Sequence, residues 1–162
     1  MWVTSLPNWR ICEAHSIFGF DERYRPTIAK FVKPGDVACV YVTGLKGTQL
    51  IGFVGLVAVT EVSLDHKDSV GWMRPKRGTA PTPEIYPHRV AWRWISKATS
   101  ALRIDPKSGS RLEELEYFTD KSRSWYSFVY PSIARLPEAD LVTVLKWISK
   151  GPPSEDFSQT TV

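Results

Sequence analysis

Two apolar segments, KPGDVACVYVT at residues 33–43 and IGFVGLVAVTEV at residues 51–62, determine the fold. The PGD triplet that opens the first segment is a turn signal. The residues after it are almost all apolar and rich in β-branched side chains, which is typical of a strand buried on both faces. Gly52 and Gly55 in the second segment indicate a bulge or sharp curvature, as barrels require. These segments predict two long, strongly curved strands.

Shorter patterned segments surround this pair of strands. We expect a strand over Trp2–Ser5, a helix over Trp9–His15 capped by Asn8, an ordered loop over Ser16–Arg25, an alternating strand over His88–Ile95, a further strand over Ala101–Ile104, and helices over Arg111–Phe118 and from Pro137. Residues 62–87 contain many prolines and glycines and predict a long irregular loop. Because strands and helices do not alternate regularly, the order favours an α+β barrel with surrounding helices over a doubly wound sheet.

Length and composition limit the class of protein. The chain has 162 residues, 43% of them hydrophobic and 23% charged, which is typical of one globular domain. We expect this domain over residues 1–150 and a flexible tail over residues 151–162. No apolar run is long enough to span a membrane. Two cysteines, Cys12 and Cys39, are too few for a disulfide scaffold, and we found no signal-peptide pattern, so we expect a cytoplasmic protein.

Positive charge gathers in one part of the sequence. The whole chain carries a net charge of +4, and residues 74–93 hold five basic residues against the single acid Glu84. Trp72, Tyr86, Trp92 and Trp94 lie within or beside this stretch. Aromatic rings can stack on bases while Arg and Lys hold phosphates, so this composition favours nucleic-acid binding. The alternative is a solvated loop beside tryptophans of the core.

Motifs of common enzymes are missing from the sequence. There is no glycine-rich phosphate loop, no nucleophile elbow and no paired-histidine zinc helix. Cys12 and His15 could share a helix face, but two ligands do not make a zinc site. Asp65, His66 and Asp68 could form a polar cluster, although the sequence pairs them with no nucleophile. We therefore expect no catalytic constellation, no metal and no cofactor.

Five motifs resemble the EVE domain family, in order and over residues 2–150. They are Ser5–Trp9 (SLPNW), His15–Phe20 (HSIFGF), Val32–Asp36 (VKPGD), Tyr86–Val90 (YPHRV) and the closing stretch from Trp125 through Leu136–Asp140 (LPEAD). The similar proteins are stand-alone archaeal and bacterial EVE domains. The resemblance implies a PUA-like fold, which is a small, strongly curved β-barrel with helices packed around it. Related PUA, YTH, ASCH and SRA domains include several that recognise RNA or modified or flipped bases.

The resemblance also implies a function and a site. We expect a nucleic-acid-binding domain that accepts a modified or flipped-out base of RNA or DNA in an aromatic pocket. The implied base-binding residues are Thr4, Ser5, Asn8, Trp9, Phe18, Phe20, Tyr41, Trp72, Tyr86 and Arg89, and the phosphate-contacting rim is Arg74, Lys76, Arg77 and Arg93.

Individual roles follow from residue chemistry. Trp9 would wall the pocket, and Phe18 and Phe20 would lie in a loop that closes over it. Arg89 alternates away from the apolar face of its strand, so we expect it to be exposed and to contact a phosphate or a base edge. Structural alternatives remain open: Trp9 and Tyr41 could be core residues, and Asn8 could be only a helix cap. Phe18 stands where the family usually has Trp.

Two other functions remain open at the level of sequence. Some ASCH-type relatives hydrolyse modified nucleosides, so a small amidohydrolase is one alternative. It would require a base and a group that positions the nucleophile within hydrogen-bond reach. The other alternative is a protein-interaction module that uses residues 72–94 as its interface.

Overall fold

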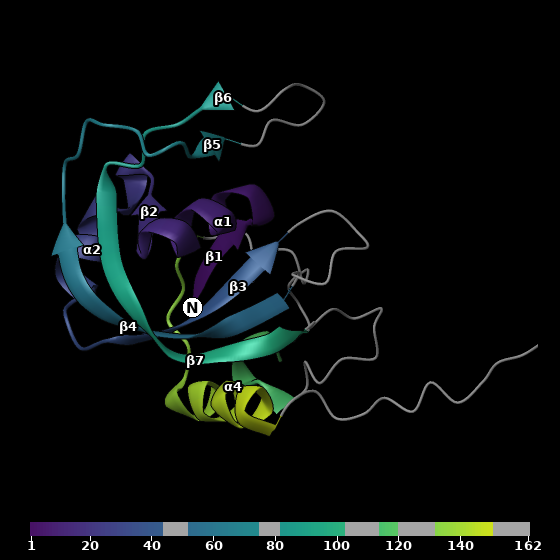
Figure 1. Ribbon diagram of the computed structural model, residues 1–162. Helices are drawn as coiled ribbons and strands as arrows, with labels where there is room; N and C mark the ends of the chain where they lie inside the picture. The colour runs from purple at the N-terminus through teal and green to yellow at the C-terminus, as the bar shows by residue number, and fades with distance from the viewer. Residues whose placement is uncertain (44–51, 75–81, 103–113, 120–131, 151–162) are drawn as a thin grey trace, which may run out of the picture.

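The computed structural model describes residues 1–43, 52–74, 82–102, 114–119 and 132–150. A strongly curved five-stranded sheet forms its centre (Figure 1). The strand order is β1 (Trp2–Ser5), β3 (Val37–Thr43), β4 (Gly52–Ser63), β7 (His88–Leu102) and β2 (Ile17–Phe20). The β1–β3 pair is parallel and the other pairs are antiparallel. A two-stranded hairpin, β5 (Met73–Arg74) and β6 (Thr82–Pro83), lies between β4 and β7 in the chain.

Helices cover both sides of this sheet (Figure 1). They are α1 (Leu6–His15), α2 (Arg25–Phe31) and α4 (Glu138–Lys150), with short 3₁₀ turns η1 (Glu22–Tyr24) and η3 (Glu116–Phe118). Helix α4 packs against β7, β4 and β3, whereas α1 contacts β1, β2 and β3. The expected fold class, an α+β protein with a strongly curved barrel-like sheet and surrounding helices, is confirmed. No helix within the described ranges is long and apolar enough to cross a membrane.

Strand β3 separates two hydrophobic cores, which confirms that it is buried on both faces. Cys39 and Tyr41 point into the core that contains α4. Val40 and Val42 point into the core that contains α1. Because side chains alternate along a strand, this division follows directly from the continuous apolar run.

The predicted irregularity in the second long strand is a β-bulge at Gly55. Neighbouring residues of β3, Val40 and Tyr41, pair with Gly55 and Phe53, so Val54 is the extra residue in β4. Phe53 and Leu56 are three residues apart and yet both point into the α4 core, because the bulge inserts one extra residue. Gly55 has φ +157°, and a Cβ there would lie 2.5 Å from the Ser96 carbonyl oxygen. The bulge therefore requires glycine.

Several predicted boundaries were wrong. Helix α1 begins at Leu6 rather than Trp9, because Pro7 fits the first turn, where its missing N–H is not needed. The expected loop over Ser16–Arg25 is strand β2 followed by η1 and the start of α2. Its apolar residues pair β2 with β7, with Phe18 opposite Val90. The two strands expected after residue 88 are one strand, β7.

Two further predicted elements are confirmed. They are the strand over Trp2–Ser5 and the last helix, which begins at Glu138. The helix expected over Arg111–Phe118 is wrong in its described part, which is not α-helical and contains the 3₁₀ turn η3. Residues 111–113 lie outside the described residues. So do Lys76, Arg77, Trp125 and the expected tail over residues 151–162.

Candidate nucleic-acid interface

The segment after β4 brings Trp72 against Gly19 of β2. The Trp72 side chain is only 1% exposed. Its ring centroid lies 5.4 Å from that of Tyr86, and the Arg89 guanidinium lies 5.4 Å from the Trp72 ring. A Cβ on Gly19 would lie 2.6 Å from Tyr86 Cβ and 2.8 Å from Trp72 Cη2. Glycine at position 19 thus leaves space for an aromatic ring. Gly19, Trp72, Tyr86 and Arg89 are called the Trp72 slot below.

Asn8 fixes the backbone next to the Trp72 slot. Its Nδ2 donates to the Met73 carbonyl oxygen, and its Oδ1 accepts from the Met73 N–H, both at 2.8 Å. The Asn8 side chain is buried and lies inside α1, so the expected helix cap is wrong. An amide side chain offers a donor and an acceptor side by side, which matches the backbone of one residue. Asn8 therefore holds β5, and with it Trp72, against α1.

Arg89 is buried, so its predicted exposure is wrong. Only 8% of the residue is accessible. Its Nη1 donates to Asp68 Oδ2 at 2.9 Å, and its Nη2 donates to the Asp68 carbonyl oxygen. Residues 64–74 fold back over this face of β7 and cover the side chain that strand alternation alone would expose. The hydrogen bond from Arg89 lowers the pKa of Asp68 below its ordinary value.

Besides Trp72, which also belongs to the buried core, four of the expected base-binding residues are core residues. Trp9 is 2% exposed, and its ring stacks on Trp92 with an interplanar angle of 15°. Phe18 and Phe20 are buried in β2 beside Trp2, rather than lying in a closing loop. Tyr41 is buried on β3 and meets Phe53 edge to face. Neighbouring rings occupy the space next to these side chains, so they do not form the walls of an open pocket.

Thr4 and Ser5 lie where β1 passes into α1. The Thr4 carbonyl oxygen accepts a hydrogen bond from the Thr43 hydroxyl at 3.2 Å, which ties β1 to β3. Ser5 occupies the N-cap of α1 without a side-chain cap bond, and its hydroxyl oxygen is buried. Their observed contacts are structural, and they do not bring these residues into the Trp72 slot.

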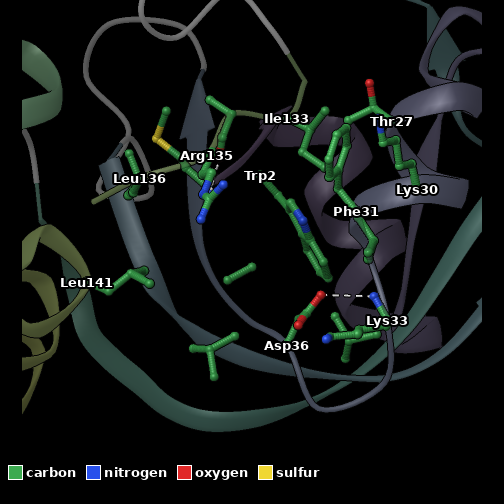
Figure 2. A pocket seen from close by; sticks show the side chains of 16 residues that line it. Trp2, Thr27, Lys30, Phe31, Lys33, Asp36, Ile133, Arg135, Leu136 and Leu141 are labelled. Atoms are coloured by element: carbon green, nitrogen blue, oxygen red, sulfur yellow. Dashed lines mark hydrogen bonds between the residues drawn. The ribbon is translucent and has the colours of Figure 1, made fainter. Parts of the chain in front are cut away.

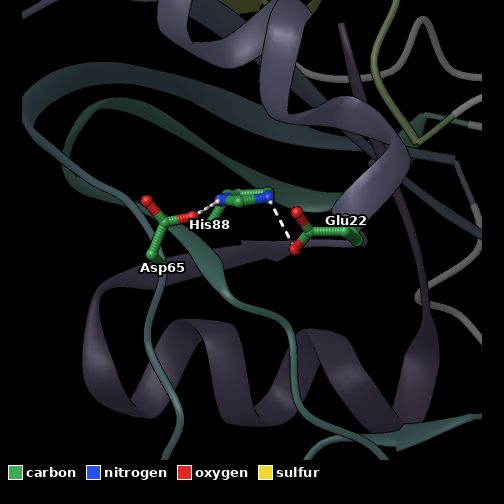
Figure 3. A group of neighbouring side chains, drawn as sticks. All are labelled: Glu22, Asp65 and His88. Atoms are coloured by element: carbon green, nitrogen blue, oxygen red, sulfur yellow. Dashed lines mark ion pairs between the residues drawn. The ribbon is translucent and has the colours of Figure 1, made fainter.

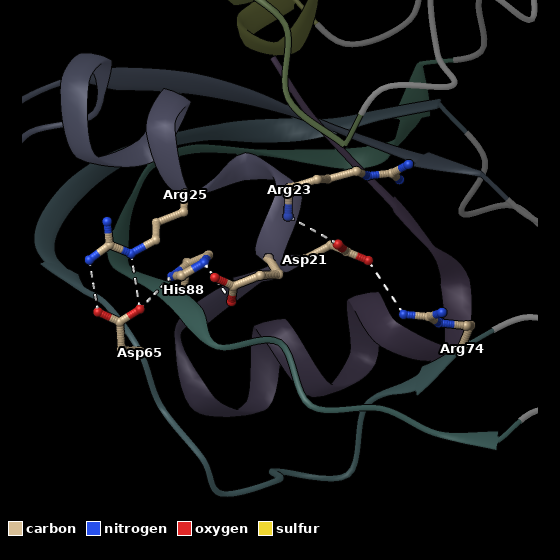
Figure 4. A network of polar contacts seen from close by, with 7 residues as sticks. Asp21, Arg23, Arg25, Asp65, Arg74 and His88 are labelled. Carbon is tan, nitrogen blue, oxygen red and sulfur yellow. Dashed lines mark hydrogen bonds and ion pairs between the residues drawn. The ribbon is translucent and has the colours of Figure 1, made fainter.

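Among the described residues, one member of the expected basic rim, Arg74, lies beside acidic groups, and Figure 4 shows its contact with Asp21. Arg74 pairs with Glu84 and lies 3.4 Å from Asp21 of the loop after β2. Arg89 pairs with Asp68, as described above. Arg93 is exposed on β7 and forms no ion pair with another described residue. The local excess of positive charge in the sequence is therefore smaller in the fold.

A cluster of Glu22, Asp65 and His88 continues this charge network (Figure 3). His88 is fully buried, and its two ring nitrogens face Glu22 at 3.2 Å and Asp65 at 3.9 Å. Three such groups could ligate a cation, but both Asp65 oxygens accept from Arg25 at 3.1 Å. The Arg25 hydrogen bond lowers the pKa of Asp65. The cluster is thus better described as an ion-pair network than as a metal centre.

One arrangement was missed in the sequence. His66 contacts the Ser63 hydroxyl through Nε2, and its Nδ1 lies 3.4 Å from Asp68 Oδ1. Ser63 thus places a hydroxyl beside His66 and Asp68, which the sequence alone did not predict. Ser63 ends β4, and its proximity to His66 depends on the turn that follows, which includes Asp65 at φ +65°. No sequence motif encodes that turn.

Comparisons with known proteins show a likeness in fold but no family. No family model matches the chain, and no curated protein matches it. Among solved structures, the chain is similar to the YTH domain of CPSF4 from Toxoplasma, crystallised in its apo form. The two share 13% sequence identity and a TM-score of 0.43, over 95% of this chain and 88% of that one. These comparisons do not assign the chain to a family.

Proposed function

We propose that this protein is a non-enzymatic nucleic-acid-binding domain that accepts a modified or flipped-out base of RNA or DNA at the Trp72 slot. The observation that carries the proposal is the Trp72 ring, held over Gly19 between the Tyr86 ring and the Arg89 guanidinium. An indole is close to a purine in size and shape, so a space that fits it also fits a base. The EVE-like motifs SLPNW and YPHRV contribute Asn8, Tyr86 and Arg89 to this region.

Polar groups beside the rings can recognise the edge of a base. The Tyr86 side chain is half-buried, and burial raises its pKa, so the phenol keeps its proton at neutral pH. A phenol can donate and accept, which suits the carbonyl and ring-nitrogen edges of bases. Arg89 adds a planar donor that can bind a phosphate or a carbonyl.

The free energy needed to move the Trp72 side chain limits how a base can enter the Trp72 slot. Expelling Trp72 into water would expose an aromatic surface worth about 4–6 kcal/mol at ~25 cal/mol per Å². Stacking a base on an aromatic ring returns only about 1–3 kcal/mol. Full expulsion of Trp72 would therefore oppose binding. In our proposal Trp72 swings away from Gly19 and then covers the incoming base, so that the indole stays stacked.

A binding assay on short strands tests this function. Fluorescently labelled RNA and DNA pentamers, unmodified or with one methylated or hydroxymethylated base, are titrated by anisotropy at two salt concentrations. We expect tighter binding of one modified strand, a loss of that preference in Trp72→Ala, and partial retention in Trp72→Phe. Arg10→Gln, an exposed cation on α1, is the charge control.

Two other outcomes would contradict the proposal. Binding that falls with salt but ignores the modification would leave only phosphate attraction and reject base recognition. Absence of binding to all strands would reject the function. Circular dichroism of each variant separates a lost contact from a lost fold.

A second candidate function, hydrolysis, rests on the Ser63–His66–Asp68 arrangement. In this mechanism His66 takes the Ser63 proton as the hydroxyl oxygen attacks a carbonyl carbon, whose π electrons move to the carbonyl oxygen, and Asp68 orients the imidazole. When the C=O bond re-forms, the bond to the leaving group breaks and the leaving group takes the proton from His66. Water then cleaves the acyl–Ser63 ester by the same two steps, with His66 as the base, and Ser63 recovers its proton. It ranks second because Asp68 is held more closely by Arg89, at 2.9 Å, than by His66, at 3.4 Å. Hydrolysis of p-nitrophenyl acetate that disappears in both Ser63→Ala and His66→Gln would support it. A rate equal to that of the variants would reject it.

A further inference from the structure

A separate cavity opens on the α2 side of the molecule (Figure 2). Its volume is about 640 Å³, and it lies between α2, the turn into β3 and residues 133–141. Trp2 and Phe31 contribute aromatic rings to its wall. It contains none of the Trp72 slot residues, so it is a distinct feature of the fold. It is called the α2 cavity below.

The α2 cavity has apolar walls that folding leaves uncovered. Phe31 is 63% exposed and Val37 is 43% exposed, although both are large hydrophobic residues. Leu136 and Leu141 complete the wall from the other side. Exposed apolar side chains that gather in one concavity mark a binding site, whereas scattered ones need no explanation. An apolar group of the ligand would therefore be buried against these walls.

Cations at the same cavity lack acidic partners. Lys30, Lys33 and Arg135 line it, and none of them forms an ion pair with another described residue. Its one acid, Asp36, uses its carboxylate to accept the Lys33 backbone N–H at 2.9 Å (Figure 2). Lys30 Nζ lies 5.0 Å from the centre of the Phe31 ring. The cavity thus joins an apolar wall to a net positive charge.

We propose that the α2 cavity binds a small molecule that carries one anionic group on a flat apolar body, such as an aromatic carboxylate, sulfonate or phosphate. The flat body lies against Phe31 and Val37, which are the exposed apolar side chains of the wall, and the anion is held by Lys33 and Arg135. A volume near 640 Å³ is in the range of small-molecule sites. The proposal goes beyond base recognition and does not depend on it.

A small aromatic anion fits this cavity better than a nucleic-acid strand does. The walls are mostly aliphatic and aromatic, and they would strip water from a sugar–phosphate backbone without replacing its hydrogen bonds. Apart from its three cations, the described lining offers only Thr27 and Asp36 as polar side chains for a base edge. One compact anion with an apolar body would pair with the cations of the cavity and cover its apolar walls at the same time.

Matched ligands test the two halves of the proposal. 2-Naphthoate, its neutral analogue 2-naphthalenemethanol and acetate are titrated into the ¹⁵N-labelled full chain and followed by NMR. We expect saturable shifts confined to α2, the turn before β3 and residues 133–137. Naphthoate should bind about tenfold more tightly than the alcohol, because each exposed charge pair contributes roughly two- to fivefold. Acetate, which lacks the apolar body, should not saturate.

Variants assign the binding to the cavity. Lys33→Gln/Arg135→Gln should remove the preference for naphthoate over the alcohol, and Phe31→Ala should weaken both ligands. All three positions lack ion pairs among the described residues, and Arg10→Gln serves as the charge control. Equal affinity for naphthoate and the alcohol, shifts outside the cavity, or unchanged binding in the double variant would overturn the proposal. Displacement of naphthoate by an oligonucleotide would also overturn it, since the cavity would then belong to a nucleic-acid surface.

Discussion

Arg89 and Asp68 decide how much positive charge the Trp72 slot presents. The Arg89 guanidinium donates twice to Asp68, once to the carboxylate and once to the carbonyl oxygen. A phosphate that binds Arg89 must replace the Asp68 carboxylate, while the carbonyl contact can remain. Asp68 is therefore an internal competitor of the ligand, and its exposed position makes that exchange feasible.

Removing this competitor should strengthen nucleic-acid binding. We expect Asp68→Asn to raise affinity for a short strand about two- to fivefold at low salt, the size of an exposed charge pair. Anisotropy titrations of the variant and the wild type measure the change. Glu61→Gln, which removes an exposed acid of β4, should leave affinity close to that of the wild type. Equal gains in both variants would mean that only net charge matters.

The same carboxylate makes stability depend on pH. Arg89 lowers the folded-state pKa of Asp68, as Arg25 lowers that of Asp65. A carboxyl whose pKa is lower in the folded state stabilises the fold above its unfolded value, about 3.9, and loses that contribution as pH falls. We expect the Tm difference between wild type and Asp68→Asn to be constant above about pH 5. It should shrink below about pH 4, and a difference that grows on acidification would contradict the sign.

Both cysteines should be unreactive in the native protein. Burial raises the pKa of Cys12 to about 12 and that of Cys39 to about 11. Thiolates, rather than thiols, react with disulfide reagents, so the folded chain should react negligibly with Ellman's reagent at pH 8. Two thiols should react after unfolding in guanidinium. Fast native reaction of one thiol would show that its core opens readily.

At the residue scale, part of the candidate site could be predicted from the sequence. Trp72, Tyr86 and Arg89 were expected near one another, and the fold brings them into contact. Asp68 was missed as the partner of Arg89, since an ion pair across 21 residues leaves no local pattern. Trp9 and Phe18 were misplaced because an aromatic residue follows the same sequence pattern whether it lies in a core or in a pocket.

At the scale of secondary structure, the bulge in β4 controls the curvature of the sheet. Gly55 meets the Ser96 carbonyl oxygen and the Trp94 ring so closely that a methyl group cannot fit without moving the backbone of β7. The close packing of β4 against β7 at this bulge therefore depends on one glycine.

Substitutions at two glycines separate crowding from backbone strain. Gly55→Ala should lower the free energy of unfolding by about 1–3 kcal/mol or more, because it overpacks the bulge. Gly35→Ala has open space around its Cβ and a φ of +94°, so only the backbone conformation is strained. We expect it to cost about 1 kcal/mol. Urea unfolding measures both, and an equal or smaller loss for Gly55→Ala would contradict the role given to the bulge.

Elements with a long apolar pattern were predicted best. The strand at 37–43 and the last helix emerged almost at their observed limits, because burial imposes a period on many residues at once. Strand β2 was missed because only four residues pair, and Gly19 within them resembles a loop signal. The Trp72 ring lies so close to Gly19 that only glycine fits there. The residue that led to the wrong loop prediction therefore belongs to the candidate site.

At the scale of the whole molecule, the two candidate sites share no residue. The Trp72 slot is built from β2, β7 and the segment between β4 and β7. The α2 cavity is built from α2, the start of β3 and residues 133–141. Positive charge is largely paired with acids at the slot and unpaired at the cavity. At the Trp72 slot, a phosphate would have to compete with the acids that pair with the arginines. At the α2 cavity, an anion would bind unpaired cations directly.

The most direct test of base recognition follows the Trp72 indole N–H by NMR. The seven tryptophans give separate Nε1–H signals in a ¹⁵N-labelled sample, and Trp72→Phe identifies the one of interest. We titrate a pentamer carrying a methylated base and an unmodified pentamer as the control. We expect the Trp72 signal to shift more than the other six tryptophan signals, and to shift further with the modified strand than with the unmodified one. A Trp72 signal that stays unchanged while the strand binds would contradict it.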